Sequence, residues 1–228
     1  MARGLVIGGS GSLGSVIADH LERAGLDVVR TSRTGGEGLM VLDSLGSPET
    51  LDAVAAAGPF ASVVWAQGAN RNDTIADLDL QAYGDTMDAN VTFVVASLAG
   101  LLERDAIRDG ARLVVLSSIW QTLARADKFS YTVSKAAIGG LVRAASVDLA
   151  PRNILINAVL PSVIDTPMTR AMLSADQVEF VAQQTGFGRL ATADDVAAMV
   201  TSLASDSNTG TTGQSIAVDL GFSHARVL

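Results

Sequence analysis

The stretch VIGGSGSLG, from Val6 to Gly14, decides the fold of this chain. It follows a short apolar run at Leu5–Ile7 and leads into a segment whose apolar residues recur at helical spacing, namely Leu13, Val16, Ile17 and Leu21. The order is therefore strand, glycine turn, helix. Such a turn brings free backbone N–H groups and the positive end of a helix dipole to one point, which suits a pyrophosphate. We expect the turn to bind a phosphorylated or nucleoside-like ligand.

The glycines of this turn fit two registers. Gly9, Gly11 and Gly14 match GxGxxG, the fingerprint of dinucleotide-binding folds, whereas counting from Gly8 gives GxxxSxG with Ser12 at the middle glycine position. The turn alone leaves open NAD, NADP and S-adenosylmethionine as ligands.

The rest of the chain fits a single α/β domain. It has 228 residues, 48% of them hydrophobic, which is enough for one substantial core. Short runs rich in Val, Ile and Leu alternate with helical patterns, and this is typical of a mostly parallel sheet. The predicted strands are Leu5–Ile7, Asp27–Thr31, Leu39–Leu42, Ala61–Ala66, Arg112–Ser117, Leu155–Val159 and Ser215–Val218.

Composition excludes several functions. A net charge of −8 argues against a nucleic-acid partner, which needs a clustered basic face. The chain has no cysteine, and its two histidines, His20 and His224, are far apart, so we expect no metal site. The longest apolar run, between Val91 and Leu102, is too short to span a bilayer and is interpreted as a buried helix. We expect a soluble cytoplasmic protein without a membrane partner.

The end of the second strand favours one cofactor. A site for NAD or S-adenosylmethionine usually offers an acid there to the ribose hydroxyls, but this chain has Ser32 and Arg33. A guanidinium suits the 2′-phosphate of NADP, and such a charge-assisted contact contributes roughly 1.5 to 3 kcal/mol. The alternative is that Arg33 is only a solvated loop charge. We expect NADP (NADPH).

Tyr131 and Lys135 are four residues apart in the predicted helix Phe129–Ala150. This spacing puts both side chains on one helix face. An ammonium beside a phenol favours the phenolate, so we expect Lys135 to lower the pKa of Tyr131 toward the working range of a general acid or base.

Thirteen residues before Tyr131, Ser118 follows the apolar run LVVLSS. Together with YTVSKAA, this arrangement resembles the active site of the short-chain dehydrogenase/reductase family, including its 3-oxoacyl-ACP reductase-like ketoreductases. The resemblance covers nearly the whole chain, with further marks at Asn90 in MDANVTFVVAS, at NAVLPSVIDTPM and in the tail ASDSNTGTTGQSIAVDLG. It implies a Rossmann-type, doubly wound, seven-stranded parallel sheet in one domain, residues 1–228, with helices on both faces.

The resemblance also implies catalytic roles. Tyr131 exchanges a proton with the substrate oxygen while hydride moves between substrate and nicotinamide, and Ser118 holds that oxygen. Lys135 binds the nicotinamide ribose, and Asn90 positions a water of the proton relay. The implied reaction is NADPH-dependent reduction of a ketone or 3-oxoacyl carbonyl (EC 1.1.1.-).

The residues that the resemblance and the turn assign to the cofactor are spread along the chain. They are Gly8, Ser10, Gly11, Ser12, Leu13, Gly14, Ser32, Arg33, Asp43, Ala66, Gln67, Gly68, Asn90, Tyr131, Lys135, Pro161, Ile164 and Thr166. The family's GxxxGxG pattern selects the register that begins at Gly8, and we expect Gly11 to supply the backbone freedom that Ser12 lacks. The chain departs from the family at Trp65-Ala66-Gln67-Gly68, where the family has Asn-Asn-Ala-Gly.

The segment 166–194 is predicted to form a lid over an apolar substrate. Its large apolar residues are Met168, Met172, Leu173, Phe180 and Phe187. Ordinary helix packing is the alternative. By resemblance we expect a homodimer or homotetramer that uses the helices of Asn90 and Tyr131, with a small face formed by Ala136, Gly139, Gly140 and Ala144.

Other functions fit less of the sequence. An alcohol dehydrogenase would use the same site in the oxidative direction. A non-catalytic NADP-binding regulator would not need the Asn-Ser-Tyr-Lys set. A methyltransferase would want an acid near Ser32, and a hydrolase using Ser118 would need a neighbouring histidine, for which His20 and His224 are poorly placed.

Overall fold

The computed structural model describes residues 1–43 and 47–224, without the side chains of Pro167, Met168 and Met172. Seven strands form one sheet in the order β3-β2-β1-β4-β5-β6-β9, and every neighbouring pair is parallel. The strands are β1 (Arg3–Ile7), β2 (Asp27–Ser32), β3 (Met40–Val41), β4 (Phe60–Trp65), β5 (Ile107–Leu116), β6 (Leu155–Pro161) and β9 (Ser215–Val218). The seven predicted strands and the doubly wound parallel sheet are confirmed.

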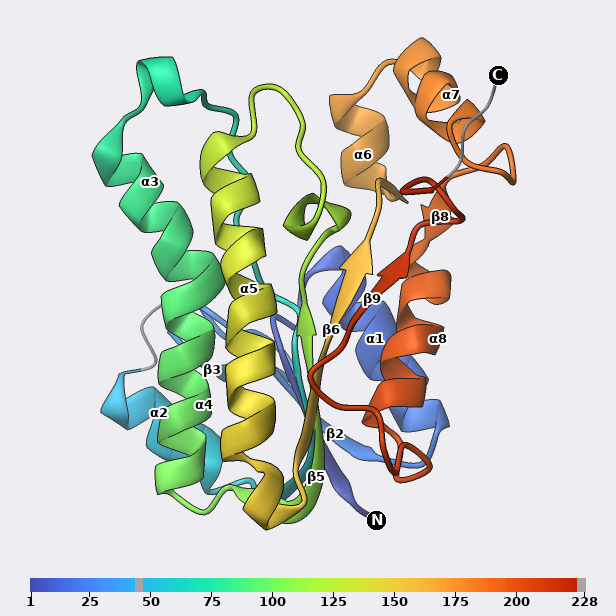
Figure 1. Ribbon diagram of the computed structural model, residues 1–228. Helices are drawn as coiled ribbons and strands as arrows, with labels where there is room; N and C mark the ends of the chain where they lie inside the picture. The colour runs from blue at the N-terminus through green and yellow to red at the C-terminus, as the bar shows by residue number, and fades with distance from the viewer. Residues whose placement is uncertain (44–46, 225–228) are drawn as a thin grey trace.

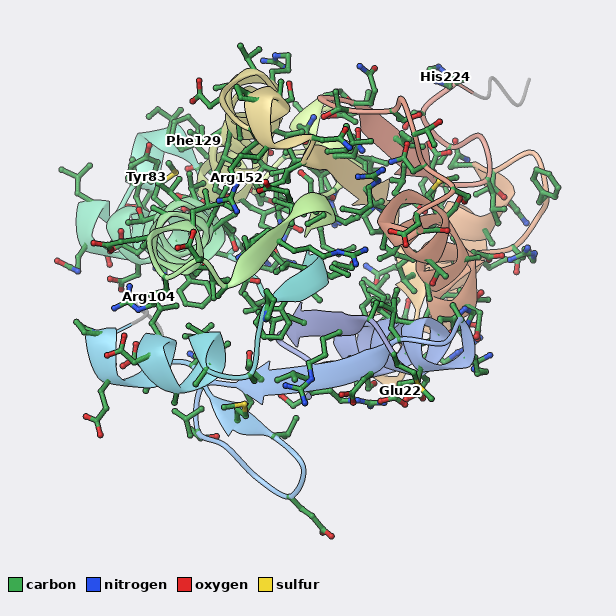
Figure 2. All side chains as sticks on the ribbon, turned by 90° about the horizontal axis from the view of Figure 1, so that it is seen from below. Glu22, Tyr83, Arg104, Phe129, Arg152 and His224 are labelled. Atoms are coloured by element: carbon green, nitrogen blue, oxygen red, sulfur yellow. The ribbon has the colours of Figure 1, made fainter. Side chains whose placement is uncertain are left out.

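Helices cover both faces of the sheet (Figure 1). One side carries α2 (Pro48–Ala55), α3 (Leu80–Met87), α4 (Phe93–Glu103) and α5 (Phe129–Asp148), and the other carries α1 (Ser12–Arg23) and α8 (Ala193–Ala204). In the view from below, Tyr83 of α3 and Phe129 of α5 lie on the side opposite Glu22 of α1 (Figure 2). The short helices α6 (Pro167–Met172) and α7 (Ala175–Gln183) lie above the carboxyl ends of the strands (Figure 1).

The core consists of two apolar layers, one on each face of the sheet. Every residue of β4 and of β6 is buried, as expected for strands covered on both faces. One layer packs these strands against α2, α4 and α5, and the other packs them against α1 and α8. Each fully buried large side chain stabilises the fold by roughly 1.5 to 3 kcal/mol relative to exposure. The sheet is therefore a rigid platform for the loops at its carboxyl edge.

The strand order places the ligand crevice. The chain leaves β1 toward β2 and β3 on one side, then crosses to β4 on the other, so the order reverses at β1. In open parallel sheets, ligands bind outside the carboxyl ends of the strands at such a reversal. The glycine turn Gly8–Gly11 follows β1 directly and therefore stands at this point.

Two features were not predicted from sequence. A two-stranded parallel ribbon, β7 (Ile164–Asp165) with β8 (Ala191–Thr192), joins the two ends of the segment that carries α6 and α7. In addition, Asp88–Thr92 is a π-helical turn between α3 and α4. π-turns of this kind occur frequently at functional sites.

The small-residue face predicted on α5 is only partly present. Ala136 and Ala144 are exposed and Gly140 is half-buried, but Gly139 is buried, and a Cβ there would lie 2.8 Å from Gln121 Nε2. Gly139 therefore serves packing within the chain, and its assignment to an exposed face was wrong. Among the described residues, no helix is long and apolar enough to cross a membrane.

Candidate cofactor and active site

Two glycines of the turn, Gly8 and Gly14, leave no room for a side chain. Gly8 has φ +81°, and a Cβ on it would lie 2.8 Å from the backbone nitrogen of Gln67. A Cβ on Gly14 would lie 2.1 Å from the carbonyl oxygen of Gly8. Because these neighbours are backbone atoms, they cannot move aside cheaply. Gly14 belongs to both registers, and a Cβ on Gly9 would also be crowded, at 2.9 Å from the Cβ of Arg30. The positive φ of Gly8, which Gly9 does not share, favours the register that starts at Gly8.

Gly11 does not play the part predicted for it. It caps α1 with φ −76° and ψ 162°, which any residue can adopt. A Cβ there would meet only the carbonyl oxygen of Gly8, at 3.4 Å. The prediction that Gly11 compensates for Ser12 by conformational freedom was wrong, because Ser12 is already the first residue of α1 and has ordinary helical geometry.

A cleft of about 360 Å³ opens beside the turn. Of the predicted cofactor residues, it is lined by Gly8, Ser10, Gly11, Ser32, Arg33, Ala66, Gln67 and Gly68. Two side-chain oxygens in its wall, Thr31 Oγ1 and Gln67 Oε1, are buried and have no hydrogen-bond partner among the described residues. Buried polar atoms are nearly always paired, so two orphans in one cleft indicate a polar ligand there. The cleft thus fits a nucleotide by its glycine cradle and its unpaired acceptors.

The end of β2 supplies one cation to this cleft. Arg33 is exposed, and it makes no hydrogen bond or ion pair with any residue that the structure describes. The Ser32 hydroxyl donates to the Gly35 carbonyl at 3.0 Å. Asp43 follows β3, and its carboxylate accepts a hydrogen bond at 2.8 Å from the backbone nitrogen of Ser47, which precedes α2.

The carboxyl end of β5 and the first turns of α5 bring three predicted residues together. Ser118 follows β5, and a side-chain hydrogen bond joins it to Tyr131. Lys135 Nζ lies 5.6 Å from the centroid of the Tyr131 ring and donates to the Leu116 carbonyl at 3.1 Å. The predicted sharing of one helix face by Tyr131 and Lys135 is confirmed.

Burial governs the titration of this group. It raises the pKa of Tyr131 above its usual value, and the hydrogen bond from Ser118 opposes the rise. Burial also lowers the pKa of Lys135 to about 8. The prediction of a lowered Tyr131 pKa was therefore wrong, because desolvation of the phenol outweighs the hydrogen bond that opposes it.

Asn90 lies in the π-helical turn, and both polar atoms of its side chain make hydrogen bonds. Its Oδ1 accepts from Ala69 N at 2.7 Å, and its Nδ2 donates to the Ala69 carbonyl at 2.9 Å and to Ser134 Oγ at 2.9 Å. The side chain thereby ties the segment after β4 to α5. Trp65 adds a second tie, since its Nε1 donates to Ser97 Oγ on α4 at 2.8 Å.

The sequence reading missed a buried lysine beside the active site. Lys128 Nζ lies 5.9 Å from the centroid of the Tyr131 ring. It donates to Asn70 Oδ1 at 2.7 Å, to Asn72 Oδ1 and, at 3.4 Å, to the Arg71 carbonyl. The ammonium is therefore solvated by neutral oxygens and holds the segment 70–72 against the start of α5. Only the rarity of lysine in this chain, two residues in all, could have drawn attention to it.

The segment after β6 frames the other side of the site. Pro161 ends β6, and Ile164 pairs with Ala191 in the ribbon. The Thr166 hydroxyl caps α6 by accepting from Thr169 N at 3.2 Å. These three predicted cofactor residues thus stand at the carboxyl edge of the sheet.

The predicted lid borders an apolar cavity of about 390 Å³. Leu173 and Phe180 line it, together with Trp120 and Phe222, whereas Phe187 is 70% exposed and does not line it. The backbone N–H of Trp120 donates to Ser118 Oγ at 3.3 Å, so the cavity lies next to the candidate catalytic serine. The predicted contributions of Met168 and Met172 lie outside the described side chains.

Comparison with known proteins identifies the family of this chain. Residues 49–223 match a family model described as enoyl-(acyl carrier protein) reductase. The chain belongs to the short-chain dehydrogenase/reductase family. It is similar to the 3-oxoacyl-[acyl-carrier-protein] reductase of Escherichia coli, with 27% identity over 233 residues and 95% of each chain covered.

Two further relatives extend the comparison. The cis-4-hydroxycyclohexanecarboxylate dehydrogenase of Sinomonas cyclohexanicum is 32% identical over 214 residues, covering 91% of this chain and 85% of the relative. A crystal structure of a gluconate 5-dehydrogenase from Burkholderia cenocepacia, in complex with NADP and tartrate, superposes with a TM-score of 0.91 at 22% identity, covering 99% and 96% of the two chains. The family makes this chain an oxidoreductase, and the structural likeness shows the shared fold.

Proposed function

We propose that this protein is an NADPH-dependent ketoreductase that converts a ketone or 3-oxoacyl carbonyl to an alcohol. The observation that carries the proposal is the convergence of Ser118, Tyr131 and Lys135 beside the cleft that the glycine turn lines, at the carboxyl edge of the sheet. A side-chain acid, a hydroxyl that can hold an oxygen and a buried ammonium are the parts that carbonyl reduction needs.

The cleft residues would hold the cofactor. The backbone N–H groups of Ser10, Ser12 and Leu13 suit the pyrophosphate, whereas that of Gly11 already donates to the Gly8 carbonyl. Arg33 suits a 2′-phosphate. Asp43 and the segment Ala66–Gly68 would serve the adenosine side, and Pro161, Ile164 and Thr166 the nicotinamide side. When bound, NADPH supplies the hydride that reduces the carbonyl carbon.

The chain's own groups then manage the proton. Tyr131 Oη donates its proton to the carbonyl oxygen as that oxygen gains negative charge, while the Ser118 hydroxyl holds the same oxygen by a hydrogen bond. Lys135, with its ammonium 5.6 Å from the centroid of the Tyr131 ring, would bind the nicotinamide ribose. Asn90 positions a water that returns a proton to the site. General acid catalysis of this kind contributes roughly 10² to 10⁴ in rate.

Several observations support the substrate class. The cavity beside Ser118 has mostly apolar walls, which favours a compact apolar carbonyl compound over a sugar. One relative is named as a reductase of 3-oxoacyl groups and another as a dehydrogenase of an alicyclic hydroxy acid.

The same site can run in the oxidative direction as an alcohol dehydrogenase. A non-catalytic NADP-binding regulator is the other alternative. For the assembly, we propose a homodimer or homotetramer.

A spectrophotometric screen tests the proposal. NADPH and NADH are each offered with ketones, 3-oxoacyl thioesters, quinones and diketones, and nucleotide oxidation is followed. We expect turnover of at least one carbonyl class with NADPH. Tight NADPH binding without turnover of any class would instead support the regulator.

The cofactor preference has its own test. Arg33→Ala removes the cation proposed to read the 2′-phosphate, so we expect NADPH affinity to fall by about tenfold or more and NADH affinity to stay nearly constant. An unchanged ratio of the two affinities would show that Arg33 does not contact the nucleotide.

A further inference from the structure

The apolar cavity beside Ser118 carries one cationic side chain on its wall. Trp120, Leu173, Phe180 and Phe222 form apolar walls, with the Trp120 and Phe222 rings packed edge to face at 6.4 Å between centroids. Among the residues that line this cavity, Arg125 is the single cation. This wall combines a large apolar surface with one charged hydrogen-bond donor, beside the neutral amides of Gln177 and Gln184. A few polar groups on an apolar wall fix the orientation of small ligands.

Arg125 has no partner within the described chain. Of the arginines that the structure describes, three have a guanidinium that makes no hydrogen bond or ion pair: Arg33, Arg125 and Arg143. Arg33 lines the cofactor cleft, Arg125 lines the apolar cavity, and Arg143 belongs to the body of α5. In a chain with 24 acidic residues, most arginines find a carboxylate, so a partnerless arginine in a pocket is available to a ligand.

The surrounding charges keep Arg125 available. Arg125 lies close enough to Lys128 to affect its titration: the pKa of Lys128 is lowered mainly by burial, and the charge of Arg125 lowers it further. Asp73 and Asp127 act on Lys128 in the opposite direction. Because Lys128 is tied to neutral oxygens of the segment 70–72, Arg125 is the cation with unused donors.

One acid also lines the cavity. Asp176, in the first turn of α7, forms no ion pair with Arg125 or with any other described residue. A carboxylate ligand would therefore be attracted by Arg125 and weakly repelled by Asp176. The net preference rests on the guanidinium, which can offer two parallel N–H donors to a carboxylate, whereas Asp176 acts only through its charge.

We propose that Arg125 forms a carboxylate subsite, so that the cavity takes a compact apolar molecule bearing a carboxylate. As a statement about the substrate, this rests on the proposed carbonyl reduction. As a statement about binding, it can be measured without turnover. The apolar body of the ligand fills the space between Trp120 and Phe180, and its carboxylate pairs with Arg125.

Tryptophan fluorescence tests the binding directly. Trp120 lines the cavity, whereas Trp65 is fully buried in the core and bonded to Ser97, so a ligand in the cavity changes the emission of Trp120. The probes are benzoate and benzamide, which share size and shape but differ in charge. We expect benzoate to bind at least about tenfold more tightly than benzamide. The Trp120→Phe variant should lose the signal.

Matched variants locate the effect. Arg125→Gln should bring benzoate to the affinity of benzamide, while Arg143→Gln, which removes a partnerless arginine elsewhere, should keep the wild-type ratio. Asp176→Asn should strengthen benzoate binding. Since Arg125 is exposed, its variant has little reason to misfold. Equal affinity of the two probes for the wild type, or an unchanged ratio in Arg125→Gln, overturns the subsite.

Kinetics separate this inference from the proposed function. Once a substrate is found, an oxo acid and its methyl ester are compared, and Arg125→Gln should lower kcat/KM by about tenfold or more for the acid alone. If no carbonyl is turned over but the benzoate preference is present and lost in Arg125→Gln, the carboxylate subsite stands and the reductase proposal fails. If carbonyls are reduced without any such preference, the subsite fails alone.

Discussion

Replacing Lys135 by methionine is expected to remove a pH dependence from the stability of the fold. Lys135 is fully buried, and burial lowers its pKa from 10.5 to about 8. Between these two values the unfolded chain holds the lysine proton and the folded chain does not. The free energy of unfolding of the wild type therefore rises with pH across this window through Lys135, because the cost of burying a charge disappears.

The size of the effect follows from the two pKa values. Their separation corresponds to about 3 kcal/mol in full, which is present as a penalty below about pH 8 and gone above about pH 10.5. Between about pH 7 and about pH 9.5 the wild type should recover about 2 kcal/mol of it. The methionine variant keeps the apolar stem and has no proton to exchange.

Urea unfolding of both proteins across this range measures the difference. Subtracting the variant from the wild type cancels the titration of groups whose surroundings the substitution leaves unchanged. Tyr131, which lies beside Lys135, keeps its proton across this range because its pKa is raised from the ordinary value of 10.0. We expect the difference, wild type minus variant, to increase by about 2 kcal/mol from the lower to the higher pH. A difference that stays flat, or that falls, would refute the burial of a titrating Lys135.

Two further predictions concern backbone and packing. Gly14→Ala places a Cβ 2.1 Å from the Gly8 carbonyl oxygen, so it should cost about 1 to 3 kcal/mol of stability and weaken nucleotide binding. Gly11→Ala, whose Cβ would have its nearest contact at 3.4 Å, should fold normally. Chemical denaturation and NADPH titration of both variants check this. Lys128→Met should lower the free energy of unfolding by about 1 to 3 kcal/mol, because Asn70 and Asn72 lose their hydrogen-bond donor. A denaturation midpoint equal to that of the wild type would show that these hydrogen bonds do not stabilise the fold.

Much of the fold was readable because its signals are local. Each strand is a short apolar run between turn residues, and the strand, glycine turn and helix at Val6–Gly14 determine where the crevice lies. The pairing of Tyr131 with Lys135 follows from helix periodicity alone. Ser118 was placed correctly because it directly follows a strand whose carboxyl end faces the same crevice.

The features that the sequence did not predict depend on contacts between residues that are distant along the chain or on the geometry of the folded backbone. The role of Gly11 was misjudged because its backbone angles, φ −76° and ψ 162°, are ones that any residue adopts, which only the folded turn reveals. Gly139 packs on Gln121, eighteen positions away along the chain. The hydrogen bonds of Lys128 require the segment after β4 to lie against the start of α5, and no periodicity in the sequence predicts that contact.

The pKa of Tyr131 shows the same limit in energetic form. Sequence spacing places a cation near the phenol and so predicts a lower pKa, but the direction depends on how much water the fold removes from the ring. Burial exceeds the favourable contacts in this chain. A residue's neighbours can thus be predicted from spacing, whereas its solvation requires the packed structure.

The central claim is that Tyr131 gives the proton in carbonyl reduction by NADPH, and Tyr131→Phe tests it most directly. With a carbonyl substrate found in the screen, kcat of the variant should fall by about 100-fold or more while NADPH still binds, since the ring remains and only the acidic hydroxyl is lost. Turnover equal to that of the wild type would contradict the account.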